Sequence, residues 1–319
     1  MKNTKVLLCY NNKGGVGKTS IVINLAETLG KDFGKKVLCI DNDSQNSLSF
    51  LANLPVNENG LFDDLENGHP DLGWLIGSYY ISGKLPSYES VQRAIVTPIY
   101  HKKFKKEKSM QWEERELPFH FDLLPGYNKD LALTEILFYS ANDCYILDPA
   151  NRPKARSALK LIVDVIRETM DYDYLIIDCA PNLGLNSIQA LLAGDELVIP
   201  VTPDFLSSAG LSNIIGNLQD LGRFVPNFHI LGVVLNAYSG TKSDQLLVED
   251  IEQYGKIMGL NIFENRLPRV NSMKKLSAED GIAVLSNEKA YRHYNARMRS
   301  LAEEILNLEE KIKEEEANG

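Results

Sequence analysis

Residues 11–20 read Asn-Asn-Lys-Gly-Gly-Val-Gly-Lys-Thr-Ser and decide the fold. An apolar run at residues 6–10 precedes this stretch, and an amphipathic helical pattern at residues 21–29 follows it. A glycine-rich loop between a strand and a helix is the setting in which such a pattern binds phosphate. The glycines let backbone N–H groups approach a polyphosphate, and the N-terminus of the next helix adds partial positive charge at the same place. The stretch therefore predicts a nucleotide-binding loop.

Individual side chains of this loop have predicted roles. Lys18 can reach the β- and γ-phosphates of a nucleotide, and the Thr19 hydroxyl can ligate Mg²⁺. The strict pattern G-x-x-x-x-G-K-[ST] requires a glycine where this chain has Asn12, and the chain instead carries an additional lysine, Lys13, before the glycines. An ordinary glycine turn with two surface lysines is the alternative, and the flanking strand and helix disfavour it. The predicted ATP contacts in the loop are Lys13, Gly14, Gly15, Val16, Gly17, Lys18, Thr19 and Ser20.

Acidic residues end two further predicted strands. Asp41 and Asp43 follow the apolar run at residues 37–40 and, being two residues apart, point to the same side. Asp178 ends the apolar run at residues 174–177, which is typical of a buried parallel strand, and an acid there is the Walker B arrangement that holds Mg²⁺ through water. An Asp/Asn-rich turn is the alternative for the first pair. Ligands of open α/β sheets bind at the C-terminal ends of the strands, so we expect one shared crevice.

The string Lys-Gly-Gly-Val-Gly-Lys-Thr at residues 13–19 resembles the deviant Walker A motif of the ParA/MinD family of dimeric P-loop ATPases, in particular partition ATPases of the ParA/Soj type. The resemblance implies that Lys13 contacts the nucleotide of the other subunit, whereas Lys18 acts within its own. It also implies that Asp41 supports the Mg²⁺ shell and that Asp43 positions the attacking water. Two residues depart from the family pattern, because Ser44 and Ala180 replace prolines.

The same resemblance suggests residues beside the nucleotide base. Asn236 lies at the tip of the predicted strand at residues 231–235, and the segment at residues 266–269 matches the loop beside the adenine in the family. The base-side candidates are Asn236, Pro268 and Arg269. A proline-punctuated loop without contact to the nucleotide is the alternative for each of them.

Apolar strands alternate with helical patterns along most of the chain, which predicts an α/β fold with a doubly wound, mostly parallel sheet and helices on both faces. We expect a single P-loop ATPase domain over residues 1–319, with an insertion at about 69–118 and a C-terminal helix at about 288–316. Within the insertion, lysines at residues 102–108 are followed by acidic residues at 113–116. Phosphate or membrane binding is one interpretation, and a solvated hairpin with charge-balanced arms is favoured.

Composition narrows the class of protein. The 319 residues carry a net charge of −9, so any DNA binding must come from a local basic patch. Four widely spaced cysteines offer no metal-binding set, which weakens iron–sulfur relatives of the fold. No apolar run is long enough to span a bilayer, and the N-terminal residues do not resemble a secretory signal. We therefore expect a cytoplasmic protein, associated with the nucleoid when it holds ATP.

The C-terminal segment has one apolar stripe, which usually packs onto its own domain. MinD-type proteins end in a basic amphipathic helix that lies on membrane, but residues 309–316 of this chain are rich in Glu, which an anionic bilayer would repel. We therefore expect no membrane binding by this helix.

The favoured function is that of a ParA-type ATPase that pairs on ATP, binds DNA without sequence preference, and is stimulated by a ParB-like adaptor. Gln219 falls near the position of a DNA-binding arginine in relatives, which weakens the DNA prediction. There are two alternatives: a MinD-like positioning ATPase that acts on a membrane or protein scaffold, and a non-hydrolysing nucleotide-gated binding module. A kinase or an amide-forming ligase would need an acceptor pocket, which the sequence does not identify. The DNA-binding candidates are Lys274, Lys275, Arg292, Arg297 and Arg299.

Overall fold

The computed structural model describes most of the chain. Residues 61–65 and 130–139, which the sequence predicts to be helical, lie outside the described residues. The described ranges are 4–54, 70–105, 112–126, 156–182, 184–203, 207–222, 229–270, 282–286 and 289–318.

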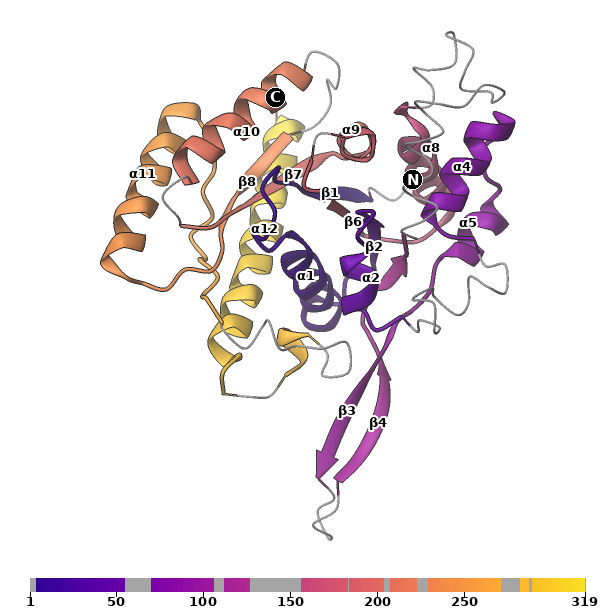
Figure 1. Cartoon of the computed structure of the whole chain (residues 1–319), viewed down its shortest axis with the longest axis horizontal. Coiled ribbons are helices and arrows are strands. Elements are labelled where there is room, and N and C mark those ends of the chain that lie inside the picture. The colour runs from indigo at the N-terminus through magenta and orange to yellow at the C-terminus, as the bar shows by residue number, and fades with distance from the viewer. Residues whose placement is uncertain are drawn as a thin grey trace.

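A six-stranded sheet forms the centre of the described structure (Figure 1). Its strand order is β5-β2-β6-β1-β7-β8, and every neighbouring pair is parallel. The mostly parallel sheet predicted from the sequence is confirmed. Its strands are β1 (Lys5–Cys9), β2 (Val37–Asn42), β5 (Asp122–Leu124), β6 (Tyr174–Cys179), β7 (Glu196–Val201) and β8 (His229–Leu235).

Side chains of each central strand alternate between two hydrophobic cores, one on each face of the sheet. In β1, Val6 and Leu8 enter one core and Leu7 and Cys9 enter the other. A strand buried on both faces requires apolar residues at nearly every position, which explains the continuous apolar runs in the sequence.

Helices cover both faces (Figure 1). One core is closed by α4 (Leu72–Ser82), α5 (Tyr88–Ala94), α8 (Ala158–Thr169), α9 (Leu185–Ala193), α10 (Ser207–Gly222) and α11 (Lys242–Met258). The opposite core is closed by α1 (Lys18–Phe33), α2 (Ser47–Leu51), the short 3₁₀ helix η3 (Ala283–Leu285) and α12 (Arg292–Asn318).

The segment before the edge strand β5 contains α4, α5 and a two-stranded antiparallel hairpin of β3 (Ile99–Lys105) and β4 (Trp112–Pro118). The hairpin extends away from the sheet (Figure 1). At its base, Tyr100 packs against Phe119 with ring centroids 5.0 Å apart. The hairpin favoured from the charge pattern is present in the described residues.

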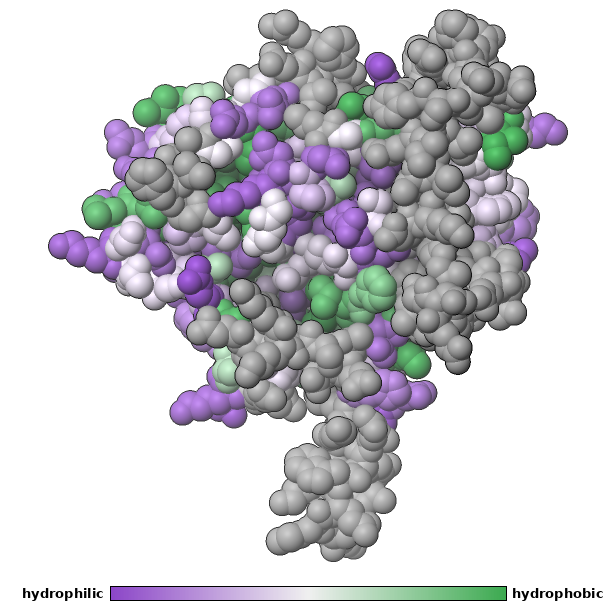
Figure 2. Space-filling model, viewed as in Figure 1, coloured by the Kyte–Doolittle hydropathy of each residue, from purple (hydrophilic) through white to green (hydrophobic). Residues whose placement is uncertain are grey.

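The C-terminal helix α12 packs along α1. Its apolar stripe is buried, from Tyr294 to Ile305, as expected for a helix that packs onto its own domain. Among the described residues, no helix is both long and apolar enough to cross a bilayer. The face of the described surface seen in Figure 2 is mainly hydrophilic, with apolar residues in scattered small groups.

Candidate nucleotide-binding site

The glycine-rich loop connects the C-terminal end of β1 to the first residue of α1. Gly17 has φ 91°, and a Cβ atom there would lie 2.2 Å from Nδ2 of Asn236. Only glycine fits a left-handed backbone this close to a neighbouring side chain. The helix that follows has no side-chain cap at its N-terminus, so its first N–H groups are available to an anion.

The two lysines of the loop are placed differently. The Lys18 side chain is buried, and its Nζ donates to the carbonyl oxygens of Asn11 (3.1 Å) and Lys13 (3.4 Å). The Lys13 side chain is exposed at the surface of the loop. Asn11 fixes this geometry, because its Oδ1 accepts from the Lys13 N–H (2.8 Å) while its Nδ2 donates to the carbonyl of Pro200 on β7 (2.6 Å). One glycine loop therefore carries a buried lysine, Lys18, and an exposed lysine, Lys13.

Strand register brings the acidic residues to the same edge as this loop. β2 and β6 pair with Asp41 opposite Asp178, and β1 pairs with β6 so that Cys9 is also opposite Asp178. All three residues lie at the C-terminal ends of parallel strands. Two carboxylates and the start of the glycine loop are thus neighbours across three adjacent strands.

Asp41 is held by a residue of the following helix. Its Oδ2 accepts two hydrogen bonds from Ser49, one from the backbone N–H (2.9 Å) and one from the hydroxyl (2.6 Å). Burial raises the pKa of the Asp41 carboxyl to about 7, and the Ser49 hydrogen bonds oppose that shift. Asp43 begins an Asx turn, with its Oδ1 accepting from the Gln45 N–H (3.0 Å).

Of the acidic residues described near this edge, Asp178 has the fewest hydrogen bonds. It is fully buried, and neither carboxylate oxygen has a hydrogen-bond partner of good geometry among the described residues. Burial, with the charge of Asp41 adding to it, raises the pKa of Asp178 well above its usual range, while the Thr19 hydroxyl and the Lys18 charge oppose the shift. A buried, unpartnered carboxyl beside a second one is a place that favours a cation.

The donor set fits Mg²⁺ that is shared with a nucleotide. Among the described residues, no three His, Cys, Asp or Glu side chains lie close enough to hold a metal ion by themselves. Magnesium rarely uses such a cage, since it keeps several waters and binds one or two carboxylates together with substrate phosphates. The Thr19 hydroxyl, Asp41 and Asp178 are the residues that would face it.

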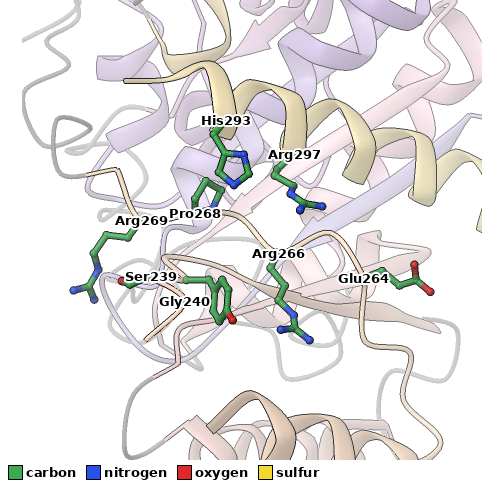
Figure 3. A pocket seen from close by; sticks show the side chains of 9 residues that line it. Ser239, Gly240, Glu264, Arg266, Pro268, Arg269, His293 and Arg297 are labelled. Carbon is green, nitrogen blue, oxygen red and sulfur yellow. The ribbon is translucent and has the colours of Figure 1, made fainter. Parts of the chain in front are cut away.

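The base-side candidates lie in a connected group next to the loop. Nδ2 of Asn236 donates to the Val16 carbonyl (2.8 Å), so the tip of β8 touches the glycine loop. Tyr238, two residues further, forms a parallel bridge with Pro268. Pro268 and Arg269 line a cavity of about 640 Å³ on this side of the molecule (Figure 3).

The structure does not gather the predicted DNA-binding residues into one patch. Lys274 and Lys275 lie outside the described residues. Arg292 is exposed at the start of α12, and Arg297 lines the cavity of Figure 3. Arg299 projects elsewhere, because it lies over the ring of Phe33, 5.8 Å from its centroid.

Sequence reasoning missed two positioning residues, Ser49 and Asn11. A serine eight residues after an acid has no local signature, and only the short turn into α2 brings Ser49 back to Asp41. Asn11 lies within the quoted loop, but its contact with Pro200 spans 189 residues and cannot be read from a local pattern.

The fold and the site define a P-loop nucleotide-binding ATPase. Residues 4–228 match the AAA_31 family, described as an AAA domain, and the chain belongs to that family. Within it the chain is an ATPase of the ParA/MinD type, which confirms the resemblance recognised from residues 13–19.

Similar sequences cover most of the chain. An uncharacterized protein of Methanocaldococcus jannaschii is 28% identical over 86% of this chain and 88% of its own length. The chromosome partitioning protein ParA of Caulobacter vibrioides is 28% identical over 83% of this chain and 80% of its own length. The virulence plasmid ParA family protein pGP5-D of Chlamydia trachomatis is 28% identical over 94% of this chain and 90% of its own length.

Solved structures share the fold. Apo McdA of Cyanothece superposes with a TM-score of 0.67 at 20% identity, covering 95% of this chain and 100% of that one. Cobyrinic acid a,c-diamide synthase of Mycobacterium smegmatis, with a bound ATP analogue and magnesium, gives a TM-score of 0.64 at 20% identity, with 95% and 94% covered. McdA and a diamide synthase thus share this architecture with the chain.

Proposed function

We propose that this protein is an ATP-dependent dimerising ATPase that binds ATP and Mg²⁺ at the glycine loop. The observation that carries the proposal is the meeting of the loop, Asp41 and the unpartnered Asp178 at one edge of the sheet. ATP-analogue- and magnesium-bound neighbours of the same fold support the choice of ligand. Residues 1–319 then form one ATPase domain, with the segment at about 69–118 as an insertion.

The proposed reaction is phosphoryl transfer to water. Such transition states spread negative charge over phosphate oxygens, so catalysis depends on positioned cations and on an oriented nucleophile. Lys18 supplies charge within the subunit, and bound Mg²⁺ would neutralise further charge on the phosphates. Asp43, which is buried two residues after Asp41, orients the water. The side chain of Lys13 is exposed at the surface of the loop, and its proposed role is to serve the nucleotide of a second copy.

The cellular role proposed is DNA partition or cargo positioning. Pairs of subunits holding ATP would bind DNA without sequence preference, and a ParB-like adaptor on the cargo would stimulate hydrolysis and release. The similarity to partition proteins of Caulobacter and of a Chlamydia plasmid supports this role. The protein would be cytoplasmic, and associated with the nucleoid in its ATP state.

Mixing the purified protein with Mg²⁺ and ATP tests the proposal. We expect slow phosphate release whose rate per subunit rises with protein concentration, because each site needs a partner's lysine. A labelled random duplex should shift only when ATP is present, and less at higher salt. A rate per subunit that is independent of concentration, together with no duplex shift at low salt, would contradict the proposal.

A MinD-like action at a membrane is the second candidate, and the structure weighs against its usual route. The apolar stripe of α12 is buried against α1, so it does not offer a free apolar face to lipid. Flotation of the protein with anionic vesicles, with and without ATP, distinguishes the two candidates. We expect no ATP-dependent flotation.

A further inference from the structure

The cavity of Figure 3 is rimmed by basic side chains. Arg266 and Arg269 come from the loop that follows α11. His293 and Arg297 come from the first turns of α12, which face that loop (Figure 3). Glu264 is the acidic residue in the lining. The cavity lining is positively charged although the whole chain has a net charge of −9, so this charge does not follow from the overall composition.

Most of this charge is not compensated within the described residues. Arg266 pairs with Glu252 (Nη2 to Oε1, 2.5 Å) and lies over the Tyr238 ring, 5.4 Å from its centroid. Arg269 and Arg297, by contrast, have no carboxylate within ion-pair distance among the described residues, and Arg297 contacts only the amide oxygen of Asn265 (3.4 Å). Within the described part of the chain, two exposed guanidinium groups are therefore available to an outside anion.

The walls that carry these groups are tied to each other. Glu304 of α12 accepts hydrogen bonds from the backbone N–H groups of Glu264 (2.8 Å) and Asn265 (3.2 Å) and from the Asn265 side chain (2.9 Å). On the other wall, the Arg269 N–H donates to the Tyr238 carbonyl (2.9 Å). The basic groups are thus mounted on a fixed frame, which lowers the entropic cost of binding.

The frame also reaches the nucleotide site. Asn236 touches the glycine loop, and Tyr238 forms part of the cavity wall. Between them, Ala237 has a left-handed backbone with φ 55°, a conformation that costs energy for a residue with a side chain. Three consecutive residues therefore connect the proposed ATP site to the cavity.

We propose that this cavity is where the phosphate backbone of duplex DNA docks. The inference rests on the DNA-binding part of the proposed function and locates it. A small anion would need buried donors that enclose it. Arg269, His293 and Arg297 are instead exposed at the rim, where they can contact the phosphates of a long polyanion. Of the predicted DNA-binding residues, Arg297 lines the cavity, whereas Arg299 lies against Phe33. Arg269, which the sequence placed beside the nucleotide base, contacts DNA instead.

The test measures binding of a labelled random-sequence duplex to the ATP-loaded protein by fluorescence anisotropy between about 50 and 200 mM salt. The variants are Arg269→Ala, Arg297→Ala and their combination. Lys313→Ala is the matched control, because it removes an exposed cation from the same helix, far from the cavity. We expect weaker binding by the cavity variants and a slope of log affinity against log salt shallower by about 0.9 for each DNA phosphate that the variant no longer neutralises.

The outcomes are distinguishable. If the wild type binds the duplex and the double variant keeps the affinity and salt slope of Lys313→Ala, the location is wrong while the proposed function stands. If the wild type with ATP does not bind the duplex at all, the inference and the DNA-binding part of the proposed function both fail. If Arg269→Ala weakens binding of labelled ATP in the absence of DNA as strongly as it weakens DNA binding, the cavity belongs to the nucleotide base and the inference is overturned.

Discussion

At the scale of single residues, Ser49 holds the buried carboxyl of Asp41 in place. Two hydrogen bonds from one serine to Oδ2, together with a longer one from the Asp43 N–H to Oδ1 (3.4 Å), hold this fully buried carboxyl. The carboxyl must face the magnesium side of the crevice in the proposed mechanism. Ser49 is thus a positioning residue, which acts through Asp41.

Replacing Ser49 with Ala should raise the Mg²⁺ concentration that gives half-maximal ATP turnover. Loss of a hydrogen bond to a charged group costs about 1.5 to 3 kcal/mol, which corresponds to at least about a tenfold shift. Ser49→Thr keeps the hydroxyl and should restore the wild-type value. A Ser49→Ala protein that melts at the wild-type temperature and shows an unchanged Mg²⁺ dependence would contradict the positioning role.

Gly17 gives a second prediction at this scale. In Gly17→Ala, the new methyl group would meet Nδ2 of Asn236, and the backbone would stay at φ 91°. We expect a loss of at least about 1 to 3 kcal/mol from loop strain. Binding of a fluorescent ATP analogue should weaken by about five- to 150-fold. Gly34→Ala, also at positive φ but in open space at the end of α1, should affect stability alone. Equal effects of the two variants on nucleotide binding would refute this.

At the scale of helices and strands, α12 is attached to the sheet through a buried polar cluster. Tyr174 donates to Glu309 Oε2 (2.5 Å), and Lys5 donates to Glu196 Oε1 (2.7 Å). Burial raises the pKa of Glu309 to about 7, and the neighbouring Glu196 adds to the shift, while Tyr174 and Lys5 oppose it. These four residues lie at the end of the sheet opposite the glycine loop.

This cluster predicts a pH dependence of stability. Because the pKa of Glu309 in the folded state lies above its ordinary 4.5, its stabilising contribution is complete below about pH 4.5 and is lost as the pH rises through about 7. Glu309→Gln is neutral throughout that window. Between pH 5 and 7.5, the wild type should lose about 1 to 3 kcal/mol of unfolding free energy relative to the variant, as measured by urea denaturation. Parallel pH profiles would show that Glu309 is ionised in the fold.

The elements were the most predictable level of this protein. The strands at Tyr174–Cys179 and Glu196–Val201 were readable from the sequence because a strand buried on both faces must be apolar throughout. The loop at residues 11–20 was readable because phosphate binding dictates glycines and a lysine at fixed spacing. The basic cavity was not, since Tyr238, Arg269 and Arg297 come from three segments. The bridge between Tyr238 and Pro268 joins the first two segments, and the packing of α12 adds the third.

At the scale of the whole molecule, the central claim is that two copies face each other across their glycine loops. Within this loop Lys13 is exposed and Lys18 is buried, and the proposal assigns Lys13 to the nucleotide of the second copy. If Lys13 acts on the partner's nucleotide, Lys13→Ala should lower ATP turnover by at least about 100-fold, the usual effect of removing a charge that stabilises a transition state. It should also weaken pairing, because the same contact bridges the two subunits.

The most direct measurement is the mass of the Asp43→Ala protein in solution, by light scattering after gel filtration, with and without Mg²⁺ and ATP. Because Asp43→Ala is expected to bind ATP without cleaving it, the protein should run as a dimer with ATP and as a monomer without it. The double variant Lys13→Ala, Asp43→Ala should remain a monomer in both conditions. A mass that does not change with ATP, or a double variant that pairs as well as Asp43→Ala, would contradict the account.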